Sequence, residues 1–181
     1  MSWLCRIILK FLGWQVKGIE NVFAQKQCVI IVAPHTSNWD FPLGLLVRTA
    51  YKMFHVKYLG KESLFKPPFG WLFKALGGYP VVRSANKNQV QAYVDALKAE
   101  PGLAIVLAPE GTRKKVDHFK TGFYYIAKGA NIPIIPCKFD FQEKVVDFGK
   151  PIICGDQETE EISRIENYFR AVPGKNPAFN F

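Results

Sequence analysis

Apolar residues occur along the chain in two kinds of segment, continuous runs and segments with helical spacing. Short continuous runs predict buried strands, which we place at residues 29–33, 56–60, 79–82, 103–107, 132–137 and 145–149. Helical spacing is clearest at 90–97, where apolar side chains fall at i, i+3, i+4 and i+7. Strands that alternate with helices indicate an α/β fold, a single-domain layered αβα arrangement with a largely parallel (mixed) sheet.

The first residues carry a pattern of their own. Apolar residues at helical spacing oppose Arg6 and Lys10, and they are Trp3, Leu4, Ile7, Ile8, Phe11 and Leu12. The run is too short to span a bilayer, which takes about 20 residues, and no small-residue cleavage site follows it. Such a helix suits a membrane interface. The compatible alternative is that it packs on the domain core. We therefore divide the chain into an amphipathic helix at 1–15, a domain at 16–172 and an irregular tail at 173–181.

The net charge of the chain indicates which kinds of molecule it could bind. The 181 residues include 24 Lys and Arg against 15 Asp and Glu, a net charge of +9. This charge suits anionic lipid, a phosphorylated ligand or nucleic acid. The sequence has no recognised nucleic-acid motif, Walker loop, dinucleotide fingerprint or GxSxG elbow, so we expect no nucleic-acid partner. The four cysteines lack the spacing of metal ligands, so we expect no metal site.

A polar turn with catalytic potential follows the strand at 29–33. It reads His35-Thr-Ser-Asn-Trp-Asp40, so that four residues separate the imidazole from the carboxylate. A carboxylate on one ring nitrogen fixes the tautomer and leaves the other nitrogen free to take a proton. We predict that His35 is a general base oriented by Asp40. The alternative for Asp40 is a cap on the helix that follows.

A second polar turn, Glu110-Gly-Thr-Arg113, follows the strand at 103–107. Gly111 allows backbone N–H groups to approach a ligand closely, and Thr112 adds a hydroxyl. Arg113 matches a phosphate with two parallel hydrogen bonds, although a surface ion pair with Glu110 is the alternative. Together the two turns suggest a transferase that acts on a phosphorylated hydroxyl compound.

These turns belong to four blocks through which the chain resembles the glycerolipid acyltransferases of the 1-acylglycerol-3-phosphate acyltransferase type. The blocks occur in the family's order at His35–Asp40, Gly78–Arg83, Pro109–Arg113 and Ile132–Pro136. Two positions depart from the common pattern. Pro34 stands where many members have Asn, and Ala108 stands where many have Phe.

The resemblance implies transfer of a fatty acyl group from acyl-CoA or acyl carrier protein to the free hydroxyl of a lysophospholipid. The expected acceptor is 1-acylglycerol-3-phosphate, and the implied reaction needs no cofactor and no acyl-enzyme. It makes His35 the base and Asp40 its orienting partner. The acceptor-binding residues that it implies are Lys61, Arg83, Glu110, Gly111, Thr112 and Arg113. We also expect an apolar groove for the acyl chain that includes the Phe65–Leu76 region.

The charge and the first helix predict a peripheral protein on the cytoplasmic face of a membrane. Two alternatives stay open. One is an acyltransferase or transacylase for a phosphate-free lysolipid. The other is a non-catalytic protein that binds anionic lipid, which needs the basic surface and the first helix but not His35 with Asp40.

Overall fold

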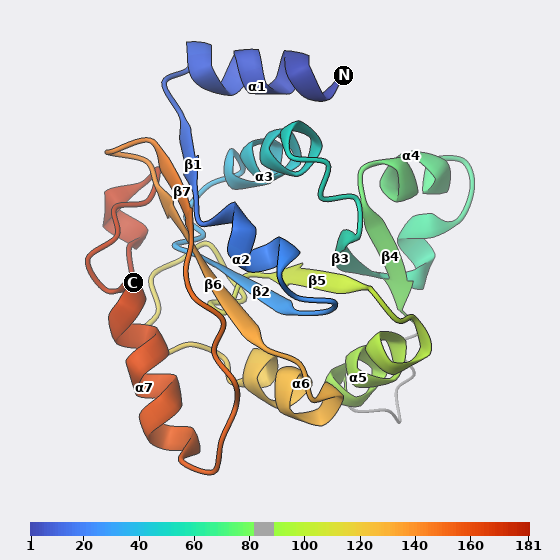
Figure 1. Ribbon diagram of the computed structural model, residues 1–181, viewed down its shortest axis with the longest axis vertical. Coiled ribbons are helices and arrows are strands. Elements are labelled where there is room, and N and C mark those ends of the chain that lie inside the picture. The colour runs from blue at the N-terminus through green and yellow to red at the C-terminus, as the bar shows by residue number, and fades with distance from the viewer. Residues whose placement is uncertain (82–88) are drawn as a thin grey trace.

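Seven strands form one mixed sheet in the computed structural model, which describes residues 1–81 and 89–181 (Figure 1). The order across the sheet is β1-β7-β6-β2-β5-β3-β4. Neighbouring strands are parallel except for β6 and β7. The fold therefore confirms the predicted α/β domain with a largely parallel sheet. The strands are β1 Gln15–Lys17, β2 Val29–Ala33, β3 Val56–Lys61, β4 Gly78–Val81, β5 Ala104–Leu107, β6 Ile134–Asp140 and β7 Val145–Phe148.

Helices cover both faces of the sheet, because the central strands are apolar on both sides. In β2, Val29, Ile31 and Ala33 pack in the core beneath α5, α6 and α7, whereas Ile30 packs on the side of α3. Parallel strands buried in this way have continuous apolar sequences, which is the pattern that predicted β2. The helices are α1 Ser2–Phe11, α2 Ile19–Phe23, α3 Asp40–Ala50, α4 Gly70–Ala75, α5 Gln89–Ala99, α6 Gly122–Ala130 and α7 Glu158–Phe169, with 3-10 turns η1 Glu62–Phe65 and η2 Pro177–Phe179.

Two short elements between α1 and β2 have no clear sequence signal. β1 has three residues and α2 has five, too few to establish a period of two or of 3.6. β1 exists because it pairs with β7, which joins Gln15 to Val145 across the sheet. β7 lies within the strand predicted at residues 145–149, and it pairs with β6 in the antiparallel direction.

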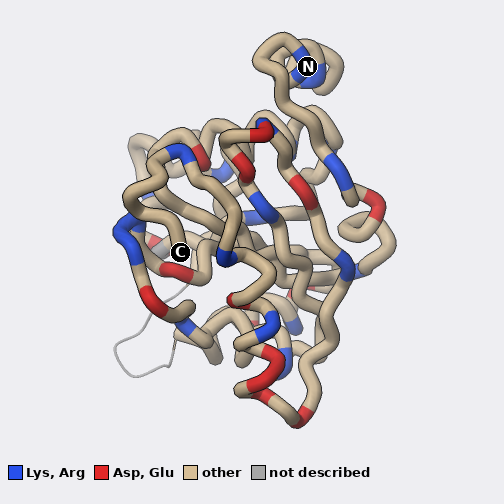
Figure 2. The backbone as a smooth tube through the Cα atoms, turned by 90° about the vertical axis from the view of Figure 1, so that its left-hand side faces the viewer, with Lys and Arg blue, Asp and Glu red and all other residues tan. Residues whose placement is uncertain are grey.

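Helix α1 packs on α3 and turns its apolar stripe outward. Leu9 is buried, and Nε of Arg6 donates to the carbonyl of Ala50 at 2.9 Å. Trp3 is 65% exposed and Phe11 is 89% exposed, and Figure 2 shows the helix standing at the top of the molecule. The two expectations for this helix are thus compatible, since one side packs and the other stays uncovered. Within residues 1–81 and 89–181, no helix has the length and apolar character needed to cross a bilayer.

The C-terminal tail docks against the body of the protein. The Asn176 N–H donates to Oγ1 of Thr36 at 3.1 Å, and the Gly174 N–H donates to Oδ1 of Asn180 at 2.9 Å. The ring of Phe181 lies 4.2 Å from that of Phe119, measured between centroids. The tail is irregular apart from η2, as predicted, but these contacts attach it to the turn that holds His35.

Candidate active site

The two polar turns singled out in the sequence lie side by side at one edge of the sheet. β2 and β5 are parallel neighbours, with Ile31 paired to Leu107, so the turns at their carboxyl ends emerge together. The backbone N–H of His35 lies 2.9 and 3.1 Å from the two carboxylate oxygens of Glu110, which accept it. The tertiary structure therefore joins the two predicted halves of the site through a direct contact.

His35 and Asp40 form a side-chain pair. Nδ1 of His35 lies 2.8 Å from Oδ2 of Asp40, and the Ser37 N–H donates to the same oxygen at 3.0 Å. The Asp40 side chain is buried, whereas 23% of the His35 side chain is exposed. A carboxylate beside Nδ1 favours the tautomer with the proton on that nitrogen. The lone pair of Nε2 is then available to accept a proton.

Asp40 orients His35 rather than capping the helix. It is the first residue of α3, and among the described residues no side-chain hydrogen bond caps this end of the helix. Its carboxylate turns back to His35 and Ser37 instead.

Glu110 is a buried carboxyl group whose pKa is displaced upward. Burial is the main cause that raises the pKa of Glu110 to about 7. The negative charge of Asp40 also raises this pKa, whereas the His35 N–H bond and the His35 charge lower it. The sequence analysis placed Glu110 among the acceptor-binding residues. The structure directs its carboxylate at the backbone of His35, and contact with an acceptor phosphate stays a prediction.

The turn after β5 presents cations to solvent. Gly111 has a φ of +64°, a left-handed backbone conformation that favours glycine, and the end of the Lys120 side chain lies beside it. Arg113 is exposed, and in the described part of the chain it forms no ion pair with Glu110. The Lys114 N–H donates to the hydroxyl of Thr112 at 3.3 Å. Arg113 is therefore available for an anion at this edge.

Two of the predicted acceptor-binding residues have less support. Lys61 ends β3, where its backbone pairs with Val81 of β4. Arg83 falls in the segment 82–88, outside the described residues. Their contacts with an acceptor stay predictions. In the rest of the chain, no three His, Cys, Asp or Glu side chains gather in a way that would hold a metal ion.

A contact from the C-terminal tail supports the histidine turn and was missed by the sequence analysis. Thr36 is buried, and its hydroxyl accepts the Asn176 N–H. Gly174 packs so closely that a Cβ there would lie 2.6 Å from the same oxygen. Thr36 and Asn176 are 140 positions apart, so no local pattern indicates their contact.

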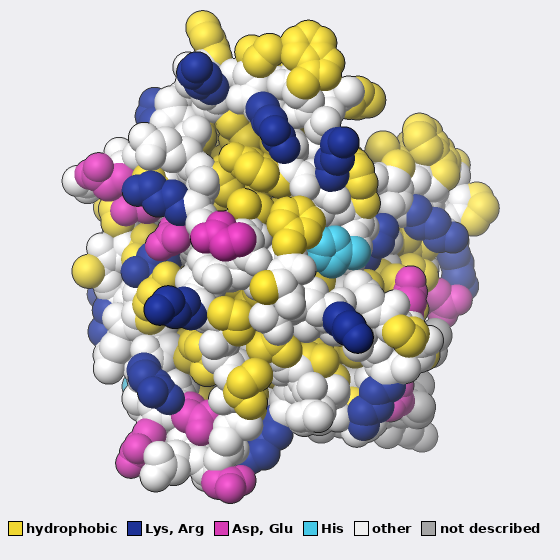
Figure 3. All heavy atoms as spheres, in the orientation of Figure 1, with side chains coloured by type: hydrophobic (Ala, Val, Ile, Leu, Met, Phe, Trp, Pro, Cys, Tyr) yellow, Lys and Arg dark blue, Asp and Glu magenta, His cyan; other side chains and the backbone are white. Residues whose placement is uncertain are grey.

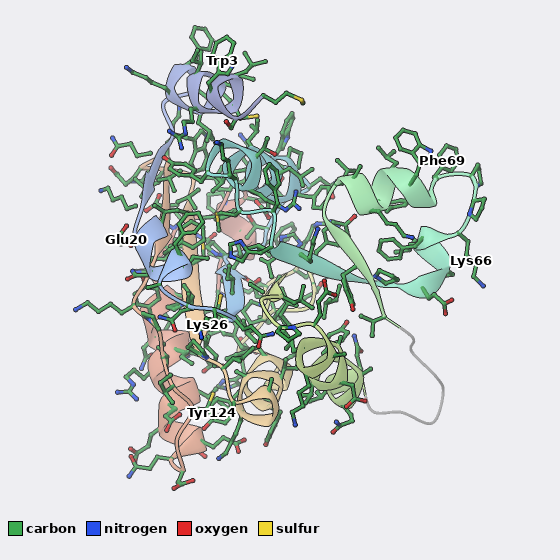
Figure 4. The ribbon with its side chains drawn as sticks, turned by 45° about the vertical axis from the view of Figure 1, so that its right-hand side comes forward. Trp3, Glu20, Lys26, Lys66, Phe69 and Tyr124 are labelled. Carbon is green, nitrogen blue, oxygen red and sulfur yellow. The ribbon has the colours of Figure 1, made fainter. Side chains whose placement is uncertain are left out.

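An apolar cavity of about 320 Å³ lies between α3 and the sheet, and His35 and Asp40 are among the residues that line it. Its apolar lining comes from several strands and from α3, and includes Ile30, Val32, Leu45, Val106 and Phe139. The expected groove residues 65–76 contribute only Leu76 among the described lining residues. In the same segment Phe69, Trp71 and Leu72 are exposed, and Figure 4 shows Phe69 at the start of α4, away from the sheet. Of the six residues of α4, only Gly70 is buried.

We predict that Glu110→Gln changes how stability depends on pH. The carboxyl pKa is about 7 in the folded protein and near 4.5 when unfolded. Between these values the folded state binds more protons, so the free energy of unfolding falls as pH rises. Wild type should therefore lose on the order of 3 kcal/mol relative to Glu110→Gln across this range. Urea unfolding of both proteins at several pH values measures the difference between their free energies of unfolding. A difference that does not change with pH would contradict the raised pKa of Glu110.

Known proteins resemble this chain in sequence and in fold. Residues 13–140 match the Acyltransferase family. The chain is 27% identical over 169 residues to the 1-acyl-sn-glycerol-3-phosphate acyltransferase of Streptococcus pneumoniae (strain ATCC BAA-255 / R6), covering 83% of this chain and 62% of that protein. It is 30% identical over 144 residues to the human 1-acyl-sn-glycerol-3-phosphate acyltransferase beta, covering 75% of this chain and 50% of that protein. The chain thus spans between half and two thirds of the length of these relatives.

The crystal structure of the 1-acyl-sn-glycerophosphate (LPA) acyltransferase PlsC from Thermotoga maritima has the same fold, with a TM-score of 0.63 and 22% identity. The alignment covers 92% of this chain and 74% of that chain. The family match runs from the residues before β1 to the end of β6, and so includes both polar turns and the strands that bring them together. On this evidence the chain is a member of the Acyltransferase family.

Proposed function

We propose that this protein transfers a fatty acyl group from an acyl thioester to the free hydroxyl of a lysophospholipid, with 1-acylglycerol-3-phosphate as the acceptor. The observation that carries the proposal is the position of the His35–Asp40 pair. It stands at the mouth of an apolar cavity, beside a turn with an exposed arginine. Acyl-CoA and acyl carrier protein both remain open as donors.

The reaction follows from the free nitrogen of His35. Nε2 takes the proton of the acceptor hydroxyl, and the oxygen attacks the thioester carbonyl to form a tetrahedral intermediate. When the intermediate collapses, the carbon–sulfur bond breaks and the thiolate takes the proton from the imidazolium. Asp40 bonds to the ring throughout, and the nearby Glu110 carboxylate adds negative charge when ionised. Both favour the transient positive charge on His35.

The two ends of the substrates require different surroundings. The cavity between α3 and the sheet suits an acyl chain, because its lining is mostly apolar. The acceptor phosphate suits the turn after β5, where Arg113, the Thr112 hydroxyl and the lysines that follow provide positive charge and donors. In this proposal Glu110 supports catalysis by positioning the His35 backbone.

We further propose that the protein acts as a peripheral protein on the cytoplasmic face of a membrane. Exposed apolar residues of α1 include Trp3, Leu4, Ile7 and Phe11, next to Arg6 and Lys10. Figure 3 shows apolar side chains protruding from the top of the molecule, where α1 lies, and at the upper right, where α4 lies. In Figure 4, Trp3 points away from the body of the protein. Apolar, aromatic and basic side chains in one surface helix suit an anionic bilayer.

A phosphate-free lysolipid is the second candidate acceptor, because the cavity and the His35–Asp40 pair serve any lysolipid hydroxyl. The exposed Arg113 favours the phosphorylated acceptor. A non-catalytic lipid-binding protein would not require a buried carboxylate 2.8 Å from an imidazole at a cavity mouth.

We predict that His35→Ala lowers the rate of acyl transfer by about 10²–10⁴-fold, since the general base is lost. Release of free thiol in the presence of lysophosphatidate measures the rate. His55→Ala is the control. His55 immediately precedes β3 and is not among the residues that line the cavity. Full activity of His35→Ala would remove the proposed mechanism.

We predict that Arg113→Ala raises KM for lysophosphatidate by roughly tenfold or more, because a charge-assisted hydrogen bond to phosphate is lost. The KM for a phosphate-free lysolipid should change little. Steady-state kinetics with both acceptors measure the contrast. Arg164→Ala, which removes an exposed arginine on α7, is the matched control. An equal change in KM for both acceptors would show that Arg113 does not bind the acceptor phosphate.

We predict that the double variant Trp3→Ser and Phe11→Ser binds vesicles of mixed phosphatidylglycerol and phosphatidylcholine about tenfold less tightly or worse, because two apolar side chains no longer enter the bilayer. Cosedimentation measures the bound fraction. Ile153→Ser is the control, since Ile153 is 71% exposed but lies outside α1. Unchanged binding of the double variant would show that α1 is not the membrane contact.

A further inference from the structure

The C-terminal tail contacts both residues that flank His35 in the sequence. A Cβ built at Gly174 would lie 2.6 Å from Oγ1 and 2.9 Å from Cγ2 of Thr36, and 3.0 Å from Cγ of Pro34. Two residues further along the tail, the Asn176 N–H donates to the same Thr36 oxygen at 3.1 Å. His35 therefore sits between two residues that touch one segment of the tail.

The close approach of the tail explains why position 174 is a glycine. The φ of Gly174 lies outside the left-handed region, so the backbone itself would accept an alanine. Cβ atoms in proteins do not come within 2.6 Å of an oxygen to which they are not bonded, however, and Thr36 is buried and branched at its own Cβ, which restricts its rotation. A methyl group at position 174 must therefore push the tail or the histidine turn out of place.

The tail is itself fixed by hydrogen bonds on the other side. The carbonyl of Pro173 accepts the Phe141 N–H at 3.0 Å, and the Gly174 N–H donates to Oδ1 of Asn180 at 2.9 Å. Phe141 directly follows β6, the strand that pairs with β2. The tail thus has a defined position relative to the strand that leads into His35.

The last part of the tail reaches the second polar turn. The ring of Phe181 lies 4.2 Å from the ring of Phe119, measured between centroids. Phe119 precedes Lys120, whose N–H donates to the carbonyl of Pro109 at 2.9 Å and closes the turn that carries Arg113. One segment therefore contacts both turns on which the proposed chemistry depends.

We propose that Gly174 and Thr36 are positioning residues for acyl transfer, through which the tail holds the imidazole of His35 against Asp40. This inference rests on the proposed function and adds residues that act on its base. The carboxylate contact at 2.8 Å orients the ring, and a shift of about 1 Å at a reacting group lowers a rate by roughly 10²-fold. Neither Gly174 nor Thr36 lines the cavity, so they should influence kcat rather than substrate binding.

Gly174→Ala is the first test. With lysophosphatidate and palmitoyl-CoA or palmitoyl acyl carrier protein, its kcat should fall by about tenfold or more, while KM for both substrates changes less than about twofold. Gly122→Ala is the matched control, because a Cβ there would lie 3.8 Å from Cγ2 of Val90, an ordinary contact distance. Its kcat should equal that of the wild type. Thermal melting of both variants shows whether each is folded under the assay conditions.

A double-mutant cycle tests whether Gly174 acts through Thr36. Thr36→Ala removes the two atoms that a Cβ at position 174 would crowd most, so Gly174→Ala should lower kcat less in this background than in the wild type. Thr36→Ser keeps the hydroxyl that accepts the Asn176 N–H, and its kcat should exceed that of Thr36→Ala. Losses of kcat that multiply independently in the cycle would overturn the proposal.

The imidazole provides a readout that does not depend on activity. At alkaline pH, the ¹⁵N chemical shifts of the two ring nitrogens of His35 report which of them carries the proton. The wild type should show the tautomer with the proton on Nδ1, which the contact with Asp40 favours. Gly174→Ala should show a mixture of the two tautomers, because the contact is weakened.

The outcomes separate this inference from the proposed function. A wild-type protein that transfers no acyl group contradicts the proposed function, and the tautomer of His35 then decides the role of the tail by itself. An unchanged kcat and an unchanged tautomer in Gly174→Ala overturn the role of the tail. If Gly174→Ala does not fold, the comparison of Thr36→Ala with Thr36→Ser decides, and equal kcat values in these two variants overturn the proposal.

Discussion

The hydrogen bond from the His35 backbone to the Glu110 carboxylate is the contact on which the geometry of the site depends. It joins two turns that leave neighbouring parallel strands, and it is buried. A charge-assisted bond in such surroundings is stronger than one between neutral groups. It holds the base-bearing turn against the turn that carries Arg113. The relative position of His35 and Arg113 therefore follows from the pairing of β2 with β5.

The contact between His35 and Glu110 requires a buried carboxyl group, and burial disfavours the ionised form of that group. Two carboxyl groups, Glu110 and Asp40, lie near one imidazole, and burial raises the pKa of Glu110 to about 7. Without a positive charge on His35, the arrangement disfavours the ionised form of Glu110. In the proposed transfer the ring becomes an imidazolium, and the same carboxyl groups would favour its positive charge. The buried Glu110 carboxylate therefore lowers the stability of the resting protein. In the proposed reaction, the same carboxylate stabilises the positive charge that develops on His35.

Helix α3 connects the separate tasks of the molecule. Its first residue, Asp40, contacts the imidazole of His35, and its middle lines the cavity. Its last residue, Ala50, accepts a hydrogen bond from Arg6 of α1. Helix α1, which carries the exposed apolar residues, thus rests on the helix that begins with Asp40. A bilayer that contacts α1 would lie beside the element that lines the acyl cavity. The proposed membrane contact and the proposed chemistry therefore share one rigid support.

The sequence by itself determined the elements and the chemistry that depends on near neighbours. Strands buried on both faces have continuous apolar sequences, so β2 and β5 were predictable, and only four residues separate His35 from Asp40. Short elements such as β1 and α2 lacked enough residues to show a period. The tertiary structure decided the direction of the Glu110 carboxylate, the attachment of the tail to Thr36 and the cavity beside α3, which took the place of the expected 65–76 groove. These contacts join residues 75 and 140 positions apart, or several strands at once. They depend on strand order and packing, which a local pattern of apolar and polar residues does not contain.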